Sequence, residues 1–272
     1  MAEHRARKRF GQNFLISDSV ISRIIEAIGP SESDTIIEVG PGCGALTGPL
    51  AESGARVLAV EFDRDLIARL KRLLGPYENV TVVNQDFLTF RPEDHGLKVF
   101  KLIGNLPYNI TSPVLQWAVD HADYVVSACF MMQREVAARL CSDPGSKDWS
   151  PLAIFTQLAF ETEKRFDVKP SSFRPQPRVT STVVTLTPRR ETVTEIPSGF
   201  ERVVRTSFGQ RRKQLVNNLV PELAGDAEEA RAVLERAGLA ADARAEQLSV
   251  DDFFRLTREI ESSRLNSSSA DS

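Results

Sequence analysis

The sequence predicts an α/β fold, a doubly wound Rossmann-like sheet with a small C-terminal all-helical domain. Three observations predict it. Apolar strand-like runs alternate with helical patterns over residues 1–140, a glycine-rich loop follows the first of these strands, and residues 198–262 have only helical periodicity. Alternation of this kind implies parallel strands joined by right-handed crossovers.

The predicted strands of the sheet are short runs rich in Val, Ile and Leu, which is typical of strands buried on both faces. They are residues 34–39, 56–61, 80–84, 99–103 and 124–131. Helical patterns precede or separate them at residues 18–28, 45–53, 64–74 and 112–119.

After Ala153 the alternation stops. Residues 160–167 and 181–186 are predicted to be two further strands around a Pro-rich link, and to add an antiparallel edge to the sheet. Residues 188–197 have the composition of a linker. Helices are then predicted at residues 200–208, 213–219, 227–237 and 250–261, the last with a capping box from Ser249 and Asp252. We therefore expect one domain over 1–190, a helical domain over 191–262 and a Ser-rich disordered tail over 263–272.

Composition excludes several classes of protein. No apolar run reaches the roughly 20 residues that a membrane helix needs, and residues 1–10 lack the apolar stretch of a secretory signal. The three cysteines are far apart, with no CxxC and no His at ligand spacing. We therefore expect a cytoplasmic protein without disulfides, bound metal or membrane contact.

The formal net charge of -3 is unusual for a nucleic-acid-binding protein, but the basic residues are clustered. Clusters occur at residues 5–9, 164–178 and 202–213. Each cluster taken alone could equally be a solvated face.

A glycine-rich loop, Gly40-Pro-Gly-Cys-Gly44, follows the first predicted strand and precedes a helix. Gly40 and Gly42 permit a tight turn and close approach of the backbone to a ligand. The loop also fits the G-x-G-x-x-G/A dinucleotide pattern, so NAD is a competing cofactor. Glu61, at the end of the second strand, suits either cofactor, because its carboxylate can accept from both ribose hydroxyls.

Asp86 follows the third strand, where its carboxylate could accept from the adenine amine of a bound adenosine. Open α/β sheets place their sites at such strand ends. The alternative is that Asp86 merely caps a turn.

The tetrapeptide Asn105-Leu106-Pro107-Tyr108 follows the fourth strand and suits chemistry on an adenine amine. That amine is a poor nucleophile, so catalysis needs acceptors that hold its N–H bonds. The Asn105 side chain and the Leu106 backbone C=O supply two, and Pro107 restricts Leu106 to extended geometry. Tyr108 offers a face on which an extruded base can stack. In a protein without the preceding strand, glycine loop and acidic residues, such a tetrapeptide could be an ordinary turn.

These motifs, in this order, resemble the ribosomal RNA adenine N6,N6-dimethyltransferases of the small-subunit type. The resemblance covers nearly the whole chain except its last ten or so residues. It rests on residues 12–15, 38–47, 60–63, 85–86, 104–111, 132–136, 172–178 and 208–213. Two departures occur: Thr180-Ser181 stands where the family usually shows Asp-Ser, and residues 148–150 where it usually carries Tyr-Gly.

The resemblance implies a methyltransferase domain that uses S-adenosyl-L-methionine to dimethylate two adjacent adenosines near the 3′ end of small-subunit (16S) rRNA. The implied partner is an immature ribosomal subunit, and the enzyme would act on it as a monomer. The implied cofactor contacts, with Gly42 of the loop, are Asn13, Leu15, Gly40, Glu61, Asp86 and Asn105. The helical domain over 191–262 would be an RNA-binding domain, in which Arg211, Arg212 and Lys213 bind RNA phosphates. We expect the three basic clusters to form one RNA-facing surface.

Three alternatives share parts of these motifs. A large-subunit rRNA adenine methyltransferase would share the fold and the tetrapeptide, although Phe208 to Leu219 looks more like the small-subunit type. An RNA-binding assembly or transcription factor could keep the fold without catalysis, which the intact tetrapeptide argues against. An NAD-dependent oxidoreductase would share the glycine loop.

Overall fold

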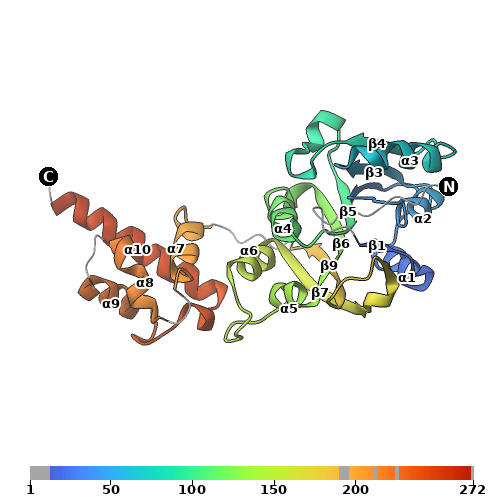
Figure 1. Ribbon diagram of the computed structural model, residues 1–272. Helices are drawn as coiled ribbons and strands as arrows, with labels where there is room; N and C mark the ends of the chain where they lie inside the picture. The colour runs from blue at the N-terminus through green and yellow to red at the C-terminus, as the bar shows by residue number, and fades with distance from the viewer. Residues whose placement is uncertain (1–12, 190–195, 211–212, 224–226, 271–272) are drawn as a thin grey trace. The chain divides into compact units, whose positions relative to one another are not determined.

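The fold is taken from a computed structural model that describes residues 13–189, 196–210, 213–223 and 227–270. The chain divides into two compact units (Figure 1). The sheet unit comprises the described residues up to Cys141 together with Ala159–Arg189, and the helical unit comprises Ser142–Leu158 and the described residues after Arg190.

The sheet unit is built on a seven-stranded sheet in the order β4-β3-β2-β5-β6-β9-β7 (Figure 1). The first five of these strands are parallel, and β9 and β7 join antiparallel beyond β6. The strands are β2 (Thr35–Val39), β3 (Arg56–Glu61), β4 (Val80–Asn84), β5 (Phe100–Asn105), β6 (Val125–Gln133), β7 (Phe160–Val168) and β9 (Ser181–Pro188). The predicted doubly wound α/β sheet and its antiparallel edge are confirmed.

Helices connect these strands by burying one apolar stripe each. In α3, Leu66, Leu70 and Leu74 recur every four residues and are all buried, while Asp63 caps the N-terminus by accepting from Asp65 N. The helices are α1 (Asp18–Ile28), α2 (Thr47–Glu52), α3 (Arg64–Leu74), α4 (Thr111–Asp120) and α5 (Arg134–Leu140). The sequence did not predict α5.

A second, two-stranded sheet joins the start of the described chain to the Pro-rich link. Strand β1 (Phe14–Leu15) pairs antiparallel with β8 (Phe173–Arg174), and Ile16 N donates to Ser172 O at 2.9 Å. Leu15 and Phe173 are both buried in the same apolar cluster. Two-residue strands carry no periodicity, so the sequence did not predict this pairing.

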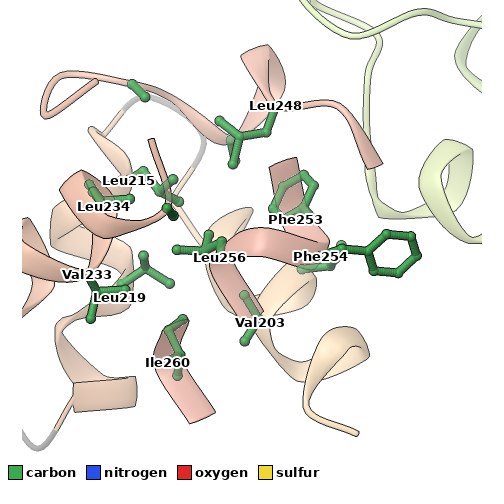
Figure 2. Close-up of a cluster of buried hydrophobic side chains, with 14 of the residues drawn as sticks. Val203, Leu215, Leu219, Val233, Leu234, Leu248, Phe253, Phe254, Leu256 and Ile260 are labelled. Carbon is green, nitrogen blue, oxygen red and sulfur yellow. The ribbon is translucent and has the colours of Figure 1, made fainter. Parts of the chain in front are cut away.

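The helical unit contains α6 (Pro151–Ala159, except for its last residue), α7 (Phe200–Ser207), α8 (Leu215–Leu219), α9 (Ala227–Arg236) and α10 (Val250–Ala270). Buried side chains from these helices converge on Phe253, Leu256 and Ile260 of α10 (Figure 2). The capping box is confirmed, because Ser249 N donates to Asp252 Oδ2 at 2.8 Å and Asp252 N donates to Ser249 Oγ at 3.1 Å.

Two domain predictions are corrected. Residues 142–158 belong to the helical unit, although the predicted boundary at residue 190 placed them with the sheet. Trp149, in one of the segments that departs from the family, is buried there and donates its indole N–H to Leu248 O at 2.8 Å. The predicted disordered tail is wrong through Ala270, because α10 continues to that residue.

Candidate active site

A pocket of about 410 Å³ lies at the carboxyl ends of strands β2 to β5 and is closed on one side by β1. This volume is in the range of small-molecule sites. The structure brings together here every predicted cofactor and tetrapeptide residue. They are Asn13, Leu15, Gly40, Gly42, Glu61, Asp86, Asn105, Leu106, Pro107 and Tyr108.

The glycine loop follows β2 with backbone angles that favour glycine. Gly40 has φ +65° and Gly42 has φ +58°. A Cβ on Gly42 would lie 3.2 Å from Cδ1 of Phe14, so the loop and β1 approach each other closely. A Cβ on Gly40 would meet no atom within 4 Å, although Gly40 lines the pocket. The loop therefore leaves open space beside its backbone.

Glu61 ends β3 with its carboxylate held by backbone amides. Oε2 accepts from Gly42 N at 3.0 Å, and Oε1 accepts from Asp63 N at 2.8 Å. Burial raises the pKa of Glu61, and these backbone hydrogen bonds oppose the rise. A carboxylate has about four acceptor sites, so the two contacts leave capacity for the hydroxyls of a ligand.

Asp86 does cap a turn, as the alternative interpretation supposed. Its Oδ1 accepts from Leu88 N at 3.0 Å at the start of a short 3₁₀ helix, Phe87–Thr89. Asp86 is nevertheless exposed and lines the pocket. Capping engages only Oδ1, so Asp86 can cap this turn and still accept a hydrogen bond from the adenine amine of a ligand through its other oxygen.

Asn105 is placed by close packing at the end of β5. A Cβ on the preceding Gly104 would lie 2.8 Å from the backbone O of Val39, so a side chain there would push β5 away from β2. The Asn105 side-chain nitrogen Nδ2 donates to the backbone O of Asn13 at 2.9 Å. This bond commits the amide nitrogen and leaves Oδ1 as the acceptor of the side chain.

The rest of the tetrapeptide forms a turn that leads into α4. Leu106 N donates to Met131 O at 3.0 Å, and Pro107 O accepts from Ile110 N at 3.0 Å. The Leu106 side chain is buried, whereas Tyr108 is half-buried. The backbone of the turn is thus held on both sides of Leu106, as the predicted fixed carbonyl requires.

Comparison with known proteins identifies the family. A family profile described as "Ribosomal RNA adenine dimethylase" matches residues 3–262. The chain belongs to this family. The dimethylase methylates adenine in ribosomal RNA and uses S-adenosyl-L-methionine as its cofactor, so the NAD interpretation is wrong.

Relatives of the dimethylase match it over almost their full length. "Ribosomal RNA small subunit methyltransferase A" of Aromatoleum aromaticum is 41% identical over 96% of each chain, and that of Bordetella pertussis is 44% identical over 94% of each. Among solved structures, a dimethyladenosine transferase from Plasmodium falciparum has a TM-score of 0.79 at 25% identity, covering 92% of this chain and 98% of that one. The 23S rRNA methyltransferase ErmE has a TM-score of 0.71 at 29% identity, covering 92% and 100%.

Sequence reasoning gave no role to Glu38, a titratable residue that lines the dimethylase pocket. Burial raises its pKa to about 7, the nearby Thr47 hydroxyl opposes the rise, and the charge of Glu61 adds to it. Its Oε2 is buried and has no hydrogen-bond partner among the residues that the structure describes. Glu38 is the one charged residue of β2, a strand predicted to be buried on both faces, and a carboxyl at such a position is the signal that could have found it.

Of the predicted RNA-binding residues, Arg211 and Arg212 lie outside the described residues of the dimethylase, and Lys213 is exposed on the helical unit. Over the described ranges, no helix is long and apolar enough to cross a membrane. Those ranges also hold no group of three His, Cys, Asp or Glu side chains able to bind a metal.

Proposed function

We propose that this dimethylase transfers two methyl groups to the N6 amine of each of two adjacent adenosines near the 3′ end of small-subunit rRNA. The small-subunit target is supported by the relatives of 41–44% identity, which are named as small-subunit enzymes. The large-subunit enzyme ErmE is 29% identical. The physiological substrate is an immature ribosomal subunit, which a monomer of the enzyme meets in the cytoplasm.

Asn105 is the observation that carries the catalytic proposal. Because Nδ2 donates to Asn13 O, Oδ1 is the side-chain atom that would accept one N–H of the target amine. The Leu106 carbonyl accepts the other. Two acceptors favour a pyramidal nitrogen with its lone pair directed at the methyl donor, so orientation and charge placement supply most of the rate.

The pocket residues fit S-adenosyl-L-methionine, which when bound supplies an electrophilic methyl group on a sulfonium. Glu61 would accept from the ribose hydroxyls and Asp86 from the adenine amine. Gly40 and Gly42 let the backbone approach the ligand, and the backbone around Asn13 and Leu15 closes the pocket. Because methyl transfer discharges the sulfonium, the amine proton can leave afterwards and no strong general base is needed.

Tyr108 is proposed to stack on the extruded target adenine. Stacking of this kind contributes about 1–3 kcal/mol, which offsets much of a base-flipping cost of a few kcal/mol. Arg211, Arg212 and Lys213 are proposed to bind RNA phosphates near the target.

Methylation assays on separated immature subunits test the target. We expect methyl incorporation into small-subunit particles, and mass spectrometry should map it to two adjacent adenosines near the 3′ end of the rRNA. The same adenosines should be unmethylated in cells that lack the enzyme. Activity on large-subunit RNA alone would refute the proposed target.

A further inference from the structure

The hydroxyl of Tyr108 meets a buried partner that belongs to neither the cofactor pocket nor the tetrapeptide. Tyr108 OH and Ser181 Oγ are 3.2 Å apart, and either atom can donate. Ser181 is 1% exposed and is separated from Tyr108 by 73 residues in the sequence. A buried hydroxyl needs a hydrogen-bond partner, and Tyr108 provides it.

Ser181 is rigidly placed by the sheet. It is the first residue of β9 and pairs with Gln133 at the end of β6 and with Val168 at the end of β7. Its backbone is therefore fixed between two neighbouring strands. The serine hydroxyl can rotate about one bond, but its position cannot shift without moving the sheet.

Tyr108, in contrast, lies on a turn outside the strands of the sheet, so the sheet does not fix the orientation of its ring. Its backbone position follows from the Pro107 turn, and its half-buried ring lines the pocket. A planar ring can stack on a base only if its plane is correctly oriented, and reactive geometry tolerates errors of well under an ångström. A hydrogen bond at the end of the ring reduces the orientations that the ring can adopt.

We infer that Ser181 is a positioning residue, which holds the ring of Tyr108 in the orientation that receives the target adenine. The inference rests on the proposed stacking role of Tyr108. Ser181 contacts no reacting atom and acts through the tyrosine. Its contribution should therefore appear in methyl transfer and not in cofactor binding.

The test compares Ser181→Ala, Tyr108→Phe and the double variant by single-turnover methyl transfer at saturating small-subunit particles. Both single substitutions delete the same hydrogen bond. A neutral hydrogen bond is worth about 0.5–1.5 kcal/mol, so each should slow transfer by about two- to twelvefold. The double variant should be no slower than either single one, because only one interaction is removed.

Two controls separate positioning from general damage. Thr182→Val deletes another buried hydroxyl one residue along β9, the one that donates to Asp167 Oδ1 at 2.6 Å, and should leave the transfer rate unchanged. For Ser181→Ala, S-adenosyl-L-methionine affinity by calorimetry should match the wild type, and the thermal midpoint should fall no further than that of Thr182→Val. A wild-type rate for Ser181→Ala, or rate losses that multiply in the double variant, would overturn the inference.

Tyr108→Ala distinguishes this inference from the stacking proposal itself. A large loss in Tyr108→Ala with a normal rate in Ser181→Ala would refute only the positioning role. A normal rate in Tyr108→Ala would refute the stacking role, and the inference with it.

Discussion

The side-chain amide of Asn105 donates a hydrogen bond of 2.9 Å to the backbone carbonyl of Asn13, 92 residues earlier in the chain. Asn13 immediately precedes β1, whose residues line the cofactor pocket. The amide expected to hold the target amine is thus oriented by the segment that closes the cofactor site. A substitution at Asn105 should therefore disturb both sites.

We expect Asn105→Ala to lower methyl transfer by about a hundredfold or more, comparable to the loss of one preorganised polar contact to a transition state. Asn105→Asp should be at least as inactive, because a carboxylate cannot donate to Asn13 O and would face that carbonyl with negative charge. Both variants should bind RNA normally, and both should bind S-adenosyl-L-methionine more weakly. Methyl incorporation, calorimetry and RNA-binding assays measure the three effects, and unchanged turnover would contradict the role of Asn105.

Gly40→Ala should weaken cofactor binding by about tenfold, since overpacking costs about 1–3 kcal/mol and 1.4 kcal/mol is tenfold in affinity. Gly96→Ala is a matched control. Both glycines have φ +65°, and a Cβ added to either would meet no atom within 4 Å, but only Gly40 lines the pocket. Both variants should lose about 1–2 kcal/mol of stability from left-handed backbone strain. Equal cofactor affinities in the two variants would show that Gly40 does not face the ligand.

The raised pKa of Glu38, about 7 against an ordinary 4.5, makes stability depend on pH. Between these values the folded chain keeps a proton that the unfolded chain has released. The stabilising contribution of this carboxyl is therefore fully present below about pH 4.5 and is lost as the pH rises through about 7. Glu38→Gln removes the dependence, so the variant should gain stability relative to the wild type from pH 5 to pH 8. Urea unfolding of both proteins at several pH values measures the difference, and a constant difference would contradict the prediction.

If residues 211–213 bind RNA phosphates, the affinity for RNA should depend on salt concentration in part through them. Arg211→Ala combined with Arg212→Ala should weaken RNA binding and reduce the slope of log K against log salt by about 0.7–0.9 per lost phosphate contact. Arg231→Ala is the control. This exposed arginine of α9 lies one helical turn from both Glu228 and Glu235, whose negative charge disfavours an RNA phosphate there, so its loss should leave the slope unchanged. Binding titrations over a range of salt concentrations give the slopes. An unchanged slope in the double variant would mean that the two arginines form an ordinary solvated face.

Sequence patterns predicted those parts of the fold in which burial repeats along the chain. The five parallel strands were recognisable as short, nearly continuous apolar runs, and α3 was recognisable because its buried leucines recur every four residues. The β1–β8 pair was not, because two residues show no period and the pairing joins Leu15 to Phe173 across the chain. The extension of α10 to Ala270 was missed because its Ser-rich composition resembles that of a disordered segment.

The residues of the candidate site likewise fall into those that a sequence pattern predicts and those that it does not. Glu61, Asp86 and Asn105 were predictable because parallel strands place their carboxyl ends at one edge. Ser181 was named only as part of a departure from the family, and its contact with Tyr108 depends on the register of β9 against β6 and β7. Such contacts are tertiary, so no local pattern encodes them.

Trp149 provides a prediction that separates the two units. Its indole N–H donates to Leu248 O within the helical unit, whereas Trp117 of α4 donates to Phe90 O within the sheet unit. Each Trp→Phe substitution leaves a backbone carbonyl without its donor and removes buried volume, at a cost of about 2–4 kcal/mol.

Trp149→Phe should speed hydrogen exchange in α7 to α10 and leave cofactor affinity unchanged, because every pocket-lining residue belongs to the sheet unit. Trp117→Phe should instead affect the sheet unit and leave hydrogen exchange in α7 to α10 unchanged. It should loosen α4 and weaken cofactor binding, because Trp117 packs on Phe87, a pocket residue, with ring centroids 4.6 Å apart. Hydrogen exchange by mass spectrometry and calorimetric titration measure both effects. Loss of cofactor affinity in Trp149→Phe would mean that the helical unit supports the pocket, and that the two units do not act separately in cofactor binding.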